Sequence, residues 1–275
     1  MVAATVGLFQ FQPHSFLMWA FLPYSLLLLT APLYFGANRP VPILLLELLA
    51  LVLVFYCLRS GQFSEVGTKF KAFAIALFLL PALQLIPLPI SLWAMMPGHD
   101  VYAQALSASA SLVDHSFRPW SVVPSATENS WLALIPPLAV FLYTLSLPKD
   151  KIKPAVNIFI FIVLFEALLG LMQYGAGADS ILRLPSSRVV ADATGTYANR
   201  DHLAGLLEMA LPLCIAMIFA AIVQRGSNRQ HTRTLRQKLA MLAASHFNRA
   251  IIYFLITIVV LLGLIFTRSR TGNML

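Results

Sequence analysis

Seven long apolar segments constrain this chain more than any other feature of its sequence. A helix that crosses the hydrocarbon of a bilayer needs about 20 mostly apolar residues. Segments of this kind lie at about residues 16–36, 41–58, 72–90, 129–147, 154–175, 202–223 and 250–267. Only 11% of the residues are charged, whereas a water-soluble domain has about 25%. We therefore predict an all-α fold: a polytopic transmembrane bundle of about seven spans, forming one integral membrane domain over residues 1–275.

The third segment, residues 72–90, is the least regular of the seven. It contains Pro81, Pro87 and Pro89. Proline removes a backbone donor and clashes with the preceding turn, so we expect this helix to kink or to end early.

The lysines and arginines predict how the helices are oriented. Loops 59–71, 148–153 and 224–249 hold 12 of the 19 basic residues and only two acids, and all three fall on one side of a seven-span chain. Cytoplasmic loops carry such an excess, so the N-terminus is predicted to be cytoplasmic. This bias accounts for the net charge of +8 without a nucleic-acid partner. Residues 1–15 contain no Lys or Arg, so we expect no cleaved signal peptide.

Four polar residues, Asn199, Arg200, Asp201 and His202, stand directly before the sixth apolar segment on the side opposite the basic loops. Asn199 or Asp201 could cap the helix by accepting from its free N–H groups. Capping does not explain Arg200 and His202, because a cation at a helix N-terminus is disfavoured by the dipole. An anion bound there would explain both, since helix N-termini favour phosphate.

A second cluster, Thr267 to Gly272, ends the last apolar segment on the same predicted side and contains Arg268 and Arg270. These arginines could simply extend to the lipid interface. Their planar forks also suit phosphate. Arginine, histidine and hydroxyl groups from two helix ends would then face one external pocket, an arrangement that fits a substrate bearing a pyrophosphate.

Three glutamates, Glu47, Glu166 and Glu208, fall inside apolar segments. Ionisable groups there are costly and are functional candidates, although each could instead stabilise helix packing as a protonated or paired residue. Glu208 could face a cavity below His202. The six histidines are scattered without metal-ligand spacing, so neither a metal nor a cofactor is predicted.

The stretch GTYANRDHLAGLLEMALPL, residues 195–213, resembles the O-antigen ligase/O-antigen polymerase family of bacterial inner-membrane glycan ligases. The family pattern there is roughly G-T-[FY]-x-N-x-N-H-x-A-G-x-L, followed by Leu-Pro. It is matched by Gly195, Thr196, Tyr197, Asn199, His202, Ala204, Gly205, Leu207, Leu211 and Pro212, whereas Asp201 stands in place of an asparagine. The closing T-x-S-R-T-G is similar to the family's next motif. Weaker similarities to the family are FGANRP at 35–40, QLIPLP at 84–89 followed by Trp93, and RPWSVVPSAT at 118–127.

The resemblance spans about residues 16–275 and implies a metal-independent glycosyltransferase of the bacterial inner membrane. Such an enzyme transfers glycan at the periplasmic face from an undecaprenyl-pyrophosphate-linked donor. The acceptor is lipid A-core in lipopolysaccharide biosynthesis, carrier-linked glycan in a polysaccharide polymerase, or protein in related enzymes.

Substrate-binding roles are implied for Arg200 and Arg270 on the pyrophosphate. Asn199 and His202 would shape the site, with Arg268 and Glu208 as supporting candidates. Family members continue with a long periplasmic loop that holds a histidine proposed as the base. That base is expected beyond Leu275, so the chain is expected to be a fragment or a truncated product that lacks activity alone.

Two alternatives from other classes stay open. The chain could transport an anionic lipid or solute, since intramembrane glutamates and broken helices also suit transport. It could also be a non-catalytic membrane subunit of an envelope polysaccharide assembly complex. Paired, interrupted spans in two halves would favour the transporter, and the sequence shows no such symmetry.

Overall fold

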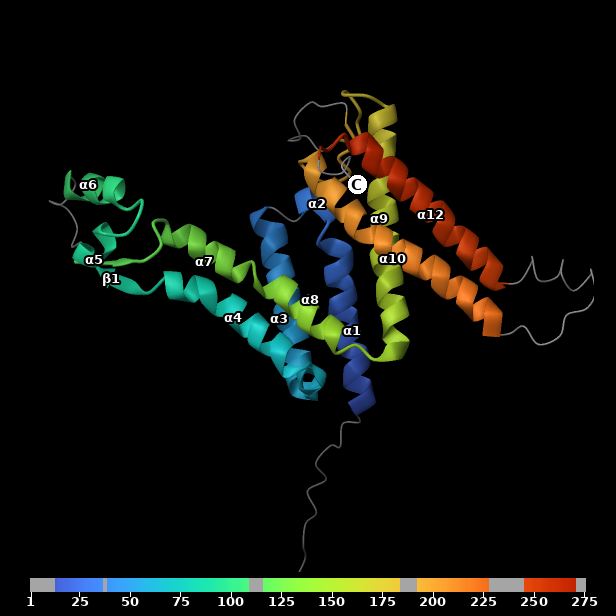
Figure 1. Ribbon diagram of the computed structural model, residues 1–275, viewed down its shortest axis with the longest axis horizontal. Coiled ribbons are helices and arrows are strands. Elements are labelled where there is room, and N and C mark those ends of the chain that lie inside the picture. Colours follow the sequence, from blue (N-terminus) through green and yellow to red (C-terminus); the bar gives the residue numbers. More distant parts are fainter. Residues whose placement is uncertain (1–12, 37–38, 109–115, 184–191, 228–244, 271–275) are drawn as a thin grey trace, which may run out of the picture. The chain divides into compact units, whose positions relative to one another are not determined.

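The computed structural model describes residues 13–36, 39–108, 116–183, 192–227 and 245–270, and these are mostly helical (Figure 1). The chain divides into two compact units. Unit 1 comprises Met1–Leu27 and Ile43–Leu147, and unit 2 comprises Leu28–Pro42 and Pro148–Leu275. Segment 28–42 therefore belongs to the C-terminal unit, although more than a hundred residues of unit 1 follow it in the sequence.

Unit 1 is built on helices that pack through aromatic side chains. Its main helices are most of α1 (Pro13–Thr30), most of α3 (Pro40–Ser60), α4 (Thr68–Gln84), α7 (Pro124–Leu132) and α8 (Ile135–Leu145). The Tyr24 hydroxyl lies 3.1 Å from Thr144 Oγ1, and the Tyr24 and Tyr143 rings are 4.8 Å apart. These contacts join α1 to α8.

Two predicted spans of unit 1 are shorter or interrupted in the structure. Helix α4 ends at Gln84, before Pro87, so the expected early end of the helix in segment 72–90 is confirmed. The segment 129–147 is divided between α7 and α8, with a turn at Ala133 and Leu134. Pro136 and Pro137 stand in the first turn of α8, where a missing N–H costs nothing.

The residues between α4 and α7 form a small lobe. Strands β1 (Pro87–Pro89) and β2 (Phe117–Pro119) pair antiparallel, with Leu88 opposite Arg118. Helices α5 (Ile90–Ala94) and α6 (Asp100–Ala108) lie between these strands in the chain. The lobe has its own hydrogen bonds, from Trp93 Nε1 to the Pro119 carbonyl at 2.7 Å and from Ser121 N to the Gln84 carbonyl at 2.7 Å.

Unit 2 is a packed group of three long helices, α9 (Lys149–Gly175), α10 (Arg200–Ser227) and α12 (Ser245–Thr267), with the short α2 (Leu33–Gly36). Its core is small and aliphatic, with fully buried Ala167, Leu203, Leu207 and Val260. A Cβ on Gly263 would lie 3.2 Å from Ala167 Cβ and from Leu207 Cδ1. This glycine therefore lets α12 approach both neighbouring helices closely.

Four helices are long and apolar enough to cross a membrane: Pro40–Ser60, Lys149–Gly175, Arg200–Val223 and Arg249–Thr267. Large apolar side chains on them, such as Phe55, Phe161 and Phe219, are more than 60% exposed, as lipid-facing residues are. The prediction of an all-α, multi-pass membrane protein is confirmed in this form. The total of seven spans and the cytoplasmic N-terminus stay predictions.

Candidate functional site

The polar residues before α10 begin with a helix cap. Asn199 Oδ1 accepts a hydrogen bond from the Asp201 backbone N–H at 3.0 Å, and α10 starts at Arg200. Asn199 is therefore the capping residue of the two that the sequence offered. Its oxygen satisfies one of the free N–H groups at the end of the helix, while the side chains of Asp201 and His202 are exposed.

Asp192 brings two predicted site arginines together from separate helix ends. Arg200 Nη1 makes a hydrogen-bonded ion pair with Asp192 Oδ2, and Arg268 Nη1 lies 3.9 Å from Asp192 Oδ1. The Asp192 side chain is only 4% exposed, whereas those of Arg200 and Arg268 are 37% and 60% exposed. A buried carboxylate thus positions two guanidinium groups that remain open to a ligand.

Arg268 is also supported by an aromatic ring. Its Nη2 donates to the Tyr174 hydroxyl at 3.2 Å, and its guanidinium carbon lies 5.5 Å from the Tyr174 ring centroid. The Arg268 backbone has φ 51, the left-handed conformation that a non-glycine residue adopts at a cost. The chain turns here directly after α12, which directs the arginine back toward α9.

Alternate residues from Thr267, the last residue of α12, to Arg270 differ in burial. Thr267 and Ser269 are buried, and the Thr267 hydroxyl donates to the Leu264 carbonyl at 2.6 Å and accepts from Ser269 N at 3.2 Å. Arg270 is exposed and makes no hydrogen bond or ion pair with another described residue. Arg268, and not Arg270, is therefore the arginine of this segment that shares Asp192 with Arg200. Thr271 and Gly272, which complete the predicted motif, lie outside the described residues.

Arg183 holds the backbone around Asp192 by donating to three carbonyls. Its three guanidinium nitrogens donate to the carbonyls of Gly177, Asp192 and Gln173 at 2.9–3.2 Å. These bonds use three of the five N–H donors of the guanidinium, so Arg183 fixes the backbone around Asp192.

Gln173, which is fully buried in α9, fastens the loop with its whole amide. Its Oε1 accepts from Thr194 N at 3.2 Å and from Thr194 Oγ1 at 3.0 Å. Its Nε2 donates to the carbonyls of Gly195 at 2.7 Å and Leu182 at 2.9 Å. An amide offers two donors and two acceptors, and all are used. Residues 192–195 are thus rigidly connected to α9.

Glu166 holds the Gly-Thr pair that opens the motif. Its Oε2 accepts from Thr196 N at 2.8 Å, and its Oε1 lies 2.6 Å from Thr196 Oγ1. Gly195 has φ 59, and a Cβ there would collide with the Glu166 carboxylate. Glu166, in the apolar helix α9, therefore has a hydrogen-bonding partner in the residues before α10.

The chain around the FGANRP segment contacts the motif loop, by which we mean residues 192–199 before α10. Phe35 N donates to the Thr196 carbonyl at 2.7 Å, and Thr196 Oγ1 lies 3.0 Å from the Pro32 carbonyl. A Cβ on Gly36 would lie 2.6 Å from the Tyr197 ring. Burial raises the pKa of the Tyr197 phenol, and the nearby Glu166 carboxylate raises it further. The phenol therefore stays protonated at neutral pH.

His202 and Glu208 are not joined to Asp192 by any contact among the described residues. The His202 ring lies 6.3 Å from the Tyr197 ring. Glu208 Oε1 is buried without a hydrogen-bond partner in the described part of the chain. Glu208 thus stays a candidate without an assigned role.

The arrangement has the chemistry of an anion site. Arg200 and Arg268 carry two positive charges against the single negative charge of Asp192. The N-terminus of α10 adds its positive dipole end and its free N–H groups. Arginine forks bind phosphate oxygens in pairs, so the excess charge suits a phosphate or pyrophosphate. Sequence reasoning found both arginines but missed Asp192, Gln173 and Tyr174, which carry no motif of their own.

Comparisons with protein families, with curated proteins and with solved structures found no match to this chain. The resemblance to the O-antigen ligase/polymerase family therefore stays a prediction.

Proposed function

We propose that this protein binds an undecaprenyl-pyrophosphate-linked glycan at the periplasmic face of a bacterial inner membrane and takes part in transferring that glycan to an acceptor. The observation that carries the proposal is the convergence of Arg200 and Arg268 on the buried Asp192 beside the N-terminus of α10. The acceptor would be lipid A-core, a carrier-linked glycan or a protein.

The two arginines would neutralise the charge that develops on the leaving pyrophosphate. Electrostatic stabilisation by groups already in position lowers a barrier most, because no reorganisation is needed during reaction. Asp192, Gln173 and Glu166 would supply that preorganisation by fixing the loop and the guanidinium groups. Arg270 follows Arg268 closely enough to contribute a third charge.

Binding of the carrier tests the proposal with the protein as it exists. The purified chain in nanodiscs would be titrated with undecaprenyl pyrophosphate, undecaprenyl phosphate and undecaprenol, with bound lipid measured by native mass spectrometry. The pyrophosphate should bind tightest and undecaprenol weakest. Arg200→Gln and Arg268→Gln should each weaken pyrophosphate binding at least about tenfold, as the loss of a charge-assisted contact of about 1.5–3 kcal/mol implies.

The matched control is Arg59→Gln, at the exposed end of α3 in unit 1. It removes the same charge away from the site and should leave the affinity unchanged. Equal affinity for all three lipids, or equal losses in all three variants, would contradict the proposal.

Transfer is tested separately from binding. The chain, and any longer product of its reading frame, would be incubated with a carrier-linked glycan and an acceptor. New glycan–acceptor product that is lost in Arg200→Gln supports an enzyme. Movement of the carrier between bilayer leaflets without product would instead support a transporter.

A further inference from the structure

We infer that the lobe between α4 and α7 is an interfacial membrane anchor, with its apolar side chains among the lipid headgroups and the upper acyl chains. The lobe is built from β1, α5, α6 and β2. All of these belong to unit 1, so the inference does not rest on the function proposed for the arginine cluster of unit 2.

Large apolar side chains are exposed throughout the lobe. Met95 directly after α5, Val101 on α6 and Phe117 on β2 are each more than 60% exposed. Residues 85–123 contain only three charged side chains, far fewer than a water-soluble segment of that length carries. Apolar surface of this kind marks contact with lipid or with another protein.

Two observations favour lipid over a protein partner. Leu79, Leu80 and Leu83, in the last two turns of α4, are about half exposed, so the exposed apolar surface continues from an apolar helix into the lobe. Tyr102 and Trp120, also about half exposed, are of the two residue types that gather at membrane–water interfaces, where one end of the ring system is apolar and the other is hydrated.

The polar residues of α6 define the side of the lobe that faces water. Asp100, Gln104 and Ser107 are exposed, and their spacing of four and three residues places them on one face of the helix. A helix turns by about 100° per residue, so Val101 and Tyr102 lie on other faces. A helix divided in this way is typical of those that lie in the plane of the interface.

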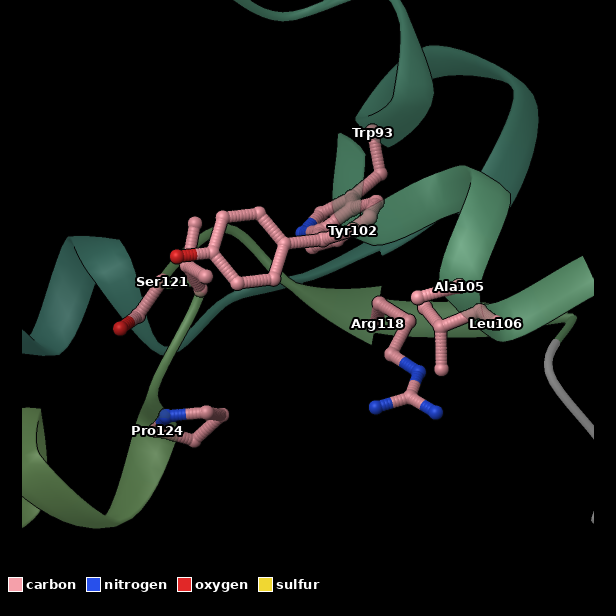
Figure 2. Close-up of a pocket in the computed structure, with 8 residues that line it drawn as sticks. Trp93, Tyr102, Ala105, Leu106, Arg118, Ser121 and Pro124 are labelled. Carbon is pink, nitrogen blue, oxygen red and sulfur yellow. The ribbon is translucent and has the colours of Figure 1, made fainter. Parts of the chain in front are cut away.

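A recess in the lobe adds apolar surface beside Tyr102. It has a volume of about 300 Å³, and six of its eight lining residues are apolar or aromatic, among them Trp93, Leu106 and Pro124 (Figure 2). Tyr102 is both half exposed and part of the wall, so the recess adjoins the exposed apolar surface. Such a mostly apolar hollow suits the end of an acyl chain better than it suits water.

The lobe is held together as one body. Trp93 is almost fully buried, donates from its indole N–H to the Pro119 carbonyl at 2.7 Å, and packs against His99 with ring centroids 4.5 Å apart. Ser121 N donates to the Gln84 carbonyl at 2.7 Å and joins the lobe to the end of α4. Depths measured at a few positions therefore report how the whole lobe is placed.

Nitroxide labels would test this placement in nanodiscs that hold one copy of the full chain. Cys57 and Cys214, both buried, would be replaced by alanine, and the labels would be attached in Met95→Cys, Val101→Cys and Gln104→Cys. Power saturation compares collisions with oxygen, which concentrates in lipid, and with a soluble nickel chelate. The labels at 95 and 101 should lie about 5–10 Å into the boundary between headgroups and acyl chains, whereas the label at 104 should be open to nickel.

Two reference positions on α3 calibrate these depths. Phe55→Cys replaces an exposed residue of a helix long enough to cross the membrane and gives the value for lipid. Arg59→Cys, exposed in the last turn of the same helix, gives the value for water. Thermal unfolding of each labelled variant would verify that it is folded.

A charge on the apolar surface should move the lobe toward water. With the label in Met95→Cys, Val101→Asp should raise the nickel collision rate toward the value of the water reference, because a charged group at this depth is costly. Gln104→Asp adds the same charge to the polar face of α6 and should leave the label at its original depth.

Nickel collision rates at 95 and 101 equal to that of Arg59→Cys would place the lobe in water and overturn the inference. Labels at both positions that are shielded from oxygen and nickel alike would mean that protein covers the surface, which overturns it as well. Loss of pyrophosphate-lipid binding in Arg200→Gln has no bearing on these outcomes, so this inference and the proposed function fail separately.

Discussion

Glu166 and Thr196 make two contacts across the start of the motif loop, Thr196 N to Glu166 Oε2 at 2.8 Å and Thr196 Oγ1 to Glu166 Oε1 at 2.6 Å. The same hydroxyl lies 3.0 Å from the Pro32 carbonyl. A hydroxyl has one proton and cannot fully serve two acceptors. Substitutions at Glu166 therefore test how the Thr196 hydroxyl proton is divided between Glu166 and the Pro32 carbonyl.

Glu166→Gln should be tolerated, because the amide oxygen can accept from Thr196 N while the amide nitrogen donates to Thr196 Oγ1. The hydroxyl proton is then free for the Pro32 carbonyl. Glu166→Leu leaves the Thr196 N–H without its acceptor and should lower stability by about 1–3 kcal/mol. Thermal unfolding in detergent would measure both, and a Gln variant as unstable as the Leu variant would contradict the donor count.

Asp192 should be coupled unequally to its two arginines. A double-mutant cycle of Asp192→Asn with Arg200→Gln should give about 1–3 kcal/mol, as a contacting pair with one buried partner does. The cycle of Asp192→Asn with Arg268→Gln should give below about 1 kcal/mol, since that pair is longer and more exposed. Chemical or thermal unfolding supplies the four free energies of each cycle. Equal couplings would show that the geometry around Asp192 is not the one described.

Gly195→Ala should be more harmful than a change at another glycine of similar conformation. Gly195 has φ 59 and its Cβ would meet the Glu166 carboxylate, whereas Gly177 has φ 80 and nothing within 4 Å. Strain in this conformation costs Gly177→Ala about 1–2 kcal/mol. Gly195→Ala should lose more than that and should also weaken pyrophosphate-lipid binding by displacing the loop. Similar melting temperatures for the two variants would count against the close approach.

Gly263 should tolerate only a small residue. Gly263→Leu would push a side chain into Ala167 and Leu207 and should destabilise unit 2 by about 1–3 kcal/mol or more. Gly205→Leu is the matched control, because a Cβ on Gly205 meets nothing within 4 Å. The melting temperatures of the two variants would be measured in the same detergent. An equal decrease in melting temperature would argue against close packing of α12.

Much of the helical architecture could be predicted from the sequence, because apolar segments of bilayer length have few alternative structures. The four helices that qualify as spans agree with predicted segments 41–58, 154–175, 202–223 and 250–267. Proline positions also predicted the early end of α4. The pairing of β1 with β2 was missed, since strands of three residues with prolines have no periodic signal.

The site was predicted less completely. Arg200 stood out because a cation before an apolar helix is electrostatically unfavourable. Asp192 did not, because an isolated acid in a loop is ordinary until the fold buries it between two arginines. Arg268, and not Arg270, lies near Asp192 because the backbone of Arg268 is left-handed directly after α12. No periodic sequence pattern predicts such a conformation.

The contact between Pro32 and Thr196 joins residues 164 positions apart, and this separation has a consequence for biosynthesis. At about 5–20 residues per second, a ribosome needs roughly 8–30 s to extend the chain from one partner to the other. The motif loop therefore cannot take its final form while the early helices enter the membrane. The backbone groups of segment 28–36 must be satisfied by other partners until then, so the arrangement of Arg200 and Arg268 around Asp192 forms late in biosynthesis.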